Sequence, residues 1–149
     1  MILGKLVSPL SCVAPLLVRV AVGFVFLYHG ADKVGLIGPD GFQESIRAAI
    51  GAAEHAGFKP AEFWGYALAL TELLGGGLLI LGFATRYAAL SLAFVMGVAV
   101  FQVHGLSVFD VRKGGFEYAG VLMLACLSLV FSGSGTLSVD QIFRGGKPQ

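Results

Sequence analysis

The chain is 149 residues long, 56% of them hydrophobic and 13% charged, with a mean hydropathy of +0.84. A soluble domain carries roughly 25% charged residues, so the charge here is too small to cover a water-facing surface. The net charge of +1 gives no support for a nucleic-acid partner. The composition predicts one domain over residues 1–149 that is embedded in lipid.

Four apolar segments are long enough, or nearly so, to cross a bilayer as helices. A spanning helix needs roughly 17–25 mostly apolar residues. The predicted helices cover about residues 13–29, 63–83, 87–104 and 115–131. The sequence therefore predicts an all-α fold, an integral membrane bundle of four transmembrane helices.

The long connection between the first two helices has a pattern of its own. Between about residues 41 and 56, apolar side chains recur at helical spacing, and Gly57 suits the end of such a helix. We expect an amphipathic helix that lies on the membrane surface or across the mouth of the bundle.

The basic residues of the loops divide almost evenly between the two sides of the membrane. Acidic residues dilute them on one side, so we place both termini in the cytoplasm.

Cys12 and Cys126 are far apart and form neither a redox motif nor a disulfide framework. Free cysteines usually pack as small apolar residues. We expect both to be buried or to lie at an interface.

Two charged residues fall near the middle of the predicted spans, Arg19 in the first helix and Glu72 in the second. Each costs roughly 2.5–3.5 kcal/mol on insertion, so such residues face the bundle interior and find partners. Counting from the helix ends places both in the middle third of the bilayer and predicts an Arg19–Glu72 ion pair. This pair either locks two helices together or belongs to a functional site.

A second set of polar residues lies towards one mouth of the bundle and forms what we call the histidine layer: His29, His104 and Glu117. These groups could bind a metal, hydrogen-bond a quinone and shuttle its protons, or reach interfacial water. Axial ligation of haem by the two histidines is a further alternative, without a haem-attachment motif to support it. Trp64 falls near a helix end, where an aromatic belt accounts for it.

These charged and histidine residues belong to an ordered pattern over most of the chain: Arg19, Gly23, Phe26, His29, Gly30, Lys33, Glu72, Gly76, Gly82, Thr85, Arg86, His104, Glu117, Gly135, Ser138 and Asp140. In order and spacing they resemble the DoxX family of small bacterial membrane proteins. The resemblance implies a four-helix protein of the inner membrane. Relatives are associated with quinone-linked oxidation of sulfur compounds, detoxification of quinones or catechols, and membrane complexes that answer oxidative stress.

These observations favour a quinone-associated redox subunit that acts with a partner protein. The predicted catalytic residues are His29, His104 and Glu117, and the predicted cofactor-binding residues are Arg19, Glu72 and Trp64. A quinone is the expected cofactor, ahead of haem or a metal. The alternatives are a non-enzymatic assembly or anchoring subunit, with or without homo-oligomerisation, and a metal or small-molecule carrier that uses the histidine layer. Whether the protein is an enzyme stays open.

Overall fold

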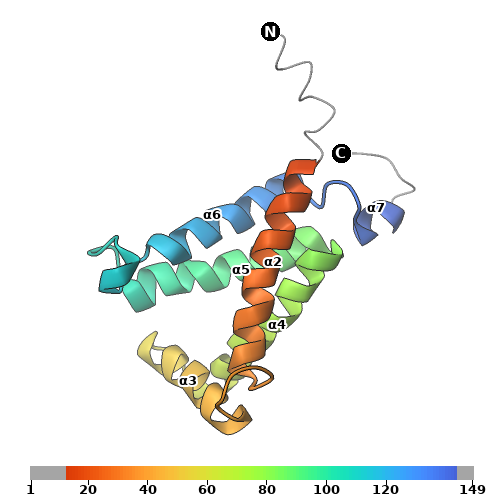
Figure 1. Cartoon of the computed structure of the whole chain (residues 1–149). Coiled ribbons are helices and arrows are strands. Elements are labelled where there is room, and N and C mark those ends of the chain that lie inside the picture. Colours follow the sequence, from red (N-terminus) through yellow and green to blue (C-terminus); the bar gives the residue numbers. More distant parts are fainter. Residues whose placement is uncertain (1–12, 144–149) are drawn as a thin grey trace.

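The computed structural model describes residues 13–143, in which every regular element is helical. The longer helices are α2 (Ala14–Lys33), α3 (Phe42–His55), α4 (Ala61–Leu81), α5 (Thr85–Val98) and α6 (Glu117–Ser132). α5 runs directly into a π-helix, η2 (Ala99–His104), and two short helices follow, η3 (Val111–Lys113) and α7 (Val139–Phe143). Figure 1 shows their arrangement.

Within residues 13–143, three helical stretches are long and apolar enough to cross a membrane. These are α2, α4 and the continuous α5–η2 stretch, Thr85–His104. α6 is also apolar but has 16 residues. The structure thus describes an all-helical membrane protein. The first helix runs further than the predicted residues 13–29 and includes Lys33.

Glycines set the distance between α2 and α4, which lie side by side and run antiparallel (Figure 1). A Cβ atom added to Gly30 would lie 2.2 Å from the backbone nitrogen of Leu73, and one added to Gly76 would lie 2.3 Å from that of Leu27. Small residues allow such close backbone approach between membrane helices. The two helices are therefore held in one register.

α5 and α6 form a second pair, whose far end diverges from the lower ends of α2 and α4 (Figure 1). The main core lies where the two pairs meet: Val22, Phe26, Leu79, Ala88, Ala89, Leu92, Ala93, Leu122, Cys126 and Leu129. Cys126 is fully buried, as predicted, while Cys12 lies outside the described residues. α3 covers the diverging end and packs Ile46 and Ala49 near Ala69 of α4.

Residues 133–143, which we call the C-terminal clamp, fold back onto the turn between α4 and α5. The Asp140 carboxylate accepts hydrogen bonds from the backbone nitrogens of Ala84 at 2.7 Å and Thr85 at 3.0 Å. The Asp140 backbone N–H donates to the Gly82 carbonyl at 2.9 Å. The carboxylate therefore caps the start of α5, where the helix dipole favours a negative charge.

Candidate functional site

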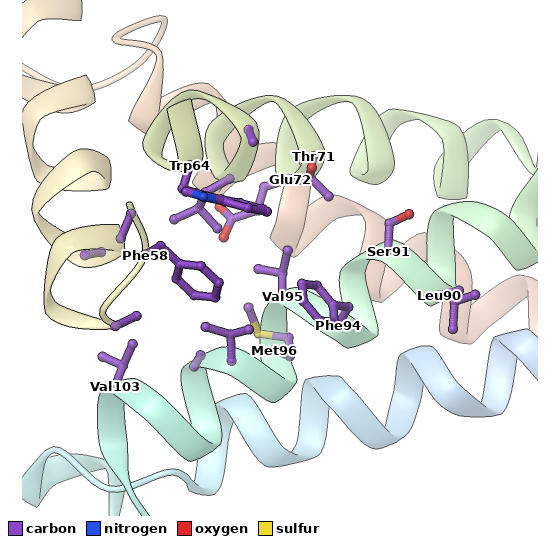
Figure 2. A pocket seen from close by; sticks show the side chains of 17 residues that line it. Phe58, Trp64, Thr71, Glu72, Leu90, Ser91, Phe94, Val95, Met96 and Val103 are labelled. Atoms are coloured by element: carbon purple, nitrogen blue, oxygen red, sulfur yellow. The ribbon is translucent and has the colours of Figure 1, made fainter. Parts of the chain in front are cut away.

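A cavity of about 600 Å³ lies between α3, α4 and the α5–η2 stretch (Figure 2). Its lining is mostly apolar, with aromatic rings from Phe58, Trp64 and Phe94. Two small hydroxyl groups, those of Thr71 and Ser91, and one carboxylate, that of Glu72, interrupt this lining. Two of these residues, Trp64 and Glu72, are predicted site residues. The cavity forms because the α5–α6 pair diverges from α4 while α3 closes that end.

Glu72 is the buried acid of this cavity, with 4% of its surface exposed. It lies on the face of α4 that also buries Ala69, Gly76 and Leu79, at helical spacing. The Lys33 Nζ atom lies 2.6 Å from Glu72 Oε2 and donates a hydrogen bond to it. Removing either member of a buried ion pair leaves an unpaired charge, which costs roughly 3–5 kcal/mol.

The register of α2 and α4 explains why Lys33 reaches Glu72. Gly30 packs directly on the backbone of α4 at Glu72 and Leu73. Lys33 lies three residues further on, and residues at this spacing share one face of a helix. The Lys33 side chain therefore emerges beside Glu72 at the end of α2.

The predicted Arg19–Glu72 ion pair is wrong. Arg19 is 1% exposed and donates to the Thr136 carbonyl at 3.4 Å and to the Leu137 carbonyl, both in the C-terminal clamp. A Cβ atom on Gly82 would strike the Arg19 guanidinium. The prediction compared the depths of the two residues by counting from estimated helix ends, and this count does not give the register of α2 and α4. In the structure Gly23 faces Gly76, and Arg19 faces the end of α4.

The histidine layer lies outside the cavity lining. His29 is exposed at the end of α2 and meets Tyr118 edge-on, with ring centroids 6.5 Å apart. His104 Nδ1 lies 2.9 Å from the Gly114 carbonyl oxygen, and Glu117 Oε2 accepts from the Val111 backbone nitrogen at 3.2 Å. His104 and Glu117 thus brace the connection between η2 and α6. Across residues 13–143, no three His, Cys, Asp or Glu side chains are grouped to hold a metal ion.

That same connection contains a local acid–base pair outside the membrane helices. Asp110 accepts from the Arg112 side chain at 3.2 Å and from the Arg112 backbone nitrogen at 3.0 Å. These hydrogen bonds hold the pKa of the Asp110 carboxyl below its ordinary value. The ionised carboxylate therefore stabilises the η3 turn.

Comparison with known proteins identifies the family of this chain. Residues 14–105 match the sequence profile of the DoxX family. The chain belongs to the DoxX family. A Bacillus subtilis (strain 168) protein named "Putative oxidoreductase CatD" is 31% identical over 137 residues, 91% of this chain and 91% of that protein. A Haemophilus influenzae protein named "Uncharacterized protein" is 33% identical over 129 residues, which cover 84% of this chain and 87% of the Haemophilus influenzae protein. No solved structure matches the chain significantly.

Several residues of the DoxX pattern gather at two places in the structure. One set joins Arg19 and the α4–α5 turn to the C-terminal clamp, through Gly82, Thr85, Ser138 and Asp140. The other set surrounds the cavity acid, and consists of Gly30, Lys33, Glu72 and Gly76. The first predicted helix ends at about residue 29, so Lys33 lies beyond it and is not among the predicted site residues. The spacing of Gly30 and Lys33 is the signal that identifies it.

Proposed function

We propose that this DoxX protein binds a membrane-soluble quinone in the apolar cavity and acts in quinone oxidation or reduction with a redox partner protein. The observation that carries the proposal is a buried carboxylate in the wall of an apolar cavity of about 600 Å³. Small-molecule sites typically measure about 300–1,000 Å³ and combine apolar walls with a few polar groups. A quinone has matching chemistry, because it is a flat apolar ring with two carbonyl oxygens.

The lining suggests how such a molecule would sit. Trp64 and Phe58, whose ring centroids are 5.0 Å apart, offer aromatic surface for a flat ring. Glu72 lines the same space (Figure 2), and a proton passed on by the Lys33–Glu72 pair would serve a quinone oxygen. Leu90 and Phe94 line the cavity but are 54% and 62% exposed, so the cavity reaches the outer surface of the helices. At this opening the apolar tail of a quinone would extend from the cavity into the lipid.

Quinone reduction consumes two electrons and two protons. In this proposal the partner protein supplies the electrons, and this chain binds the ring and supplies the protons. The name of the Bacillus subtilis relative, an oxidoreductase, supports a redox role. The histidine layer keeps a predicted role in proton transfer, at a distance from the cavity lining. A cofactor contact for Arg19 is not part of the proposal, because Arg19 is engaged by the C-terminal clamp.

The proposal also places the protein in a bacterial inner membrane with both termini in the cytoplasm. α6 serves as the fourth span, since 16 helical residues extend roughly 24 Å at about 1.5 Å per residue. α3 then lies at the membrane surface, with Ile46 and Ala49 turned towards the bundle. This position agrees with the charged side chains Glu44 and Arg47, which are exposed on the same helix.

Trp64 gives a direct test, because it is the only tryptophan of the sequence and lines the cavity. A short-chain quinone added to the purified full chain in lipid nanodiscs should quench the Trp64 fluorescence saturably. Ala99→Phe, which adds a ring to the cavity wall, should weaken binding by roughly tenfold or more. The matched control is Leu124→Ala, because Leu124 is 63% exposed on α6 and outside the lining.

Quenching that is linear with quinone and equal in all three proteins would reject the cavity as a quinone site. The assembly or anchoring role, with a structural Lys33–Glu72 pair, would then be the better account. His104→Ala and Glu117→Gln belong in the same titration. If the histidine layer contacts the ring, these variants weaken binding; if it acts only on protons, their affinity stays unchanged.

A further inference from the structure

A second, polar cleft lies beside the apolar cavity. It measures about 640 Å³ and is formed by the end of α2, the α2–α3 connection and α3. Its charged lining residues are Asp32, Lys33, Asp40, Glu44 and Arg47. With both acids and bases exposed around it, this cleft is open to water, whereas the apolar cavity reaches the lipid-facing surface of α5.

The Lys33–Glu72 ion pair joins these two spaces. Lys33 lines the polar cleft and Glu72 lines the apolar cavity, with 2.6 Å between Nζ and Oε2. The Lys33 side chain is 24% exposed and the Glu72 side chain 5% exposed, so accessibility falls from the cleft towards the cavity. Between the two spaces, α3 presents small side chains, and Ala52 lines both.

We infer that Lys33 is a proton relay between water in the polar cleft and the ligand in the apolar cavity, with Glu72 as the intermediate carrier. This inference rests on the proposed quinone site and specifies the path of its protons. Lysine suits the task because its ammonium group can lose and regain a proton, which arginine cannot do in a protein. Lys33 thus acts through Glu72 and is a positioning and relay residue.

In quinone reduction, protons pass from the cleft to the ligand. The partner redox protein delivers two electrons to the quinone, and each oxygen gains one proton. For each proton, a Lys33 N–H bond breaks as Glu72 is protonated, and the Glu72 O–H bond breaks as the ligand O–H bond forms. Water in the cleft then returns a proton to Lys33. Oxidation of a quinol runs the same path in reverse and releases two protons to the cleft.

The charges around the Lys33–Glu72 pair favour proton transfer from the polar cleft towards the apolar cavity. Asp32, Asp40 and Glu44 outnumber Arg47 around Lys33, so the cleft carries a negative field that concentrates protons. Tyr118 of α6, outside the cavity lining, is a further titratable group within electrostatic range of Glu72. A carboxylate so placed accepts protons from one side and passes them to the other.

The test uses the full chain in nanodiscs, loaded with one short-chain quinol and mixed rapidly with ferricyanide, which takes electrons without taking protons. Quinone absorbance reports oxidation, a pH-indicator dye reports proton release, and Trp64 quenching reports affinity. Lys33→Arg keeps the positive charge beside Glu72 but cannot release a proton. We expect oxidation and proton release to slow by roughly 10²-fold, with the Kd unchanged within about twofold. The matched control is Lys113→Arg, because Lys113 is exposed in η3 and lies outside both linings, and this change should alter neither rate.

Wild-type rates in Lys33→Arg, with intact affinity, would overturn the relay and leave the quinone site standing. Absence of saturable binding in the wild-type protein would overturn the proposed function and the relay together. If Lys33→Arg does not fold, the wild-type protein in D₂O carries the test. A proton relay slows in D₂O, and an unchanged oxidation rate there would overturn the inference.

Discussion

The Lys33 ammonium lies 2.6 Å from the Glu72 carboxylate, at the point where an apolar cavity and a polar cleft meet. The pair depends on the close approach of α2 and α4, because Gly30 rests on the α4 backbone next to Glu72. Each charge of the pair is partly withdrawn from water and balanced by the other.

Lys33→Met and Glu72→Gln should show strong energetic coupling. Each single change leaves one charge without its partner and should lower the free energy of unfolding by roughly 3 kcal/mol, the lower end of the buried range because Lys33 is partly exposed. The double variant should lose much less than the sum. Unfolding in mixed detergent, followed by circular dichroism, measures the cycle. Additive losses would show that the two side chains do not interact.

Arg19 and Glu72 should behave independently. Arg19 is held by carbonyl oxygens of the C-terminal clamp, whereas Glu72 is held by Lys33. Distant sites without shared partners add within roughly 0.3–0.5 kcal/mol. In a double-mutant cycle of Arg19→Met and Glu72→Gln, measured by the same unfolding assay, the coupling free energy should therefore stay within that margin. A coupling well above it would restore the ion pair predicted from sequence.

Alanine substitutions at two neighbouring glycines of α4 should differ in their effect on stability. An added methyl group on Gly76 would meet the Leu27 backbone at 2.3 Å, so Gly76→Ala should cost roughly 1–3 kcal/mol of stability. Gly77, the next residue, has nothing within 4 Å of an added Cβ. Gly77→Ala should be neutral or stabilising by about 0.5–1 kcal/mol, since alanine favours the helix. Thermal unfolding of both variants in one detergent gives the comparison, and equal losses would contradict the register.

The η3 turn should loosen at acidic pH. Hydrogen bonds from Arg112 lower the pKa of Asp110, so the folded turn binds its proton less readily than the unfolded chain does. The stabilisation is therefore complete above the ordinary pKa of 3.8 and is lost as the pH falls through the lower folded value. Amide hydrogen exchange at Arg112 should accelerate in that range, after correction for intrinsic rates. Asp110→Asn should abolish the pH dependence, and the same dependence in both proteins would contradict this role.

Much of the fold could be predicted from the sequence, because apolar length and helical periodicity are local properties. Residues 13–143 are all-helical, Cys126 is buried, and the DoxX resemblance is confirmed by the match over residues 14–105. The cost of burying charge also identified Glu72 as a residue that needs a partner. Its partner could not be predicted by counting depth from helix ends, since an error of one or two turns exchanges one candidate for another.

What the sequence by itself determined is that lipid surrounds the helices, since the chain has too little charge for water, and that Arg19 and Glu72 must find partners inside. The tertiary structure alone decided which partners these are. The backbone contacts at Gly30 and Gly76 set the register of α2 and α4. In this register Glu72 pairs with Lys33, and Arg19 donates hydrogen bonds to the C-terminal clamp. The divergence of α5 from α4 then opened the apolar cavity beside Glu72, a non-local packing result that no single segment encodes.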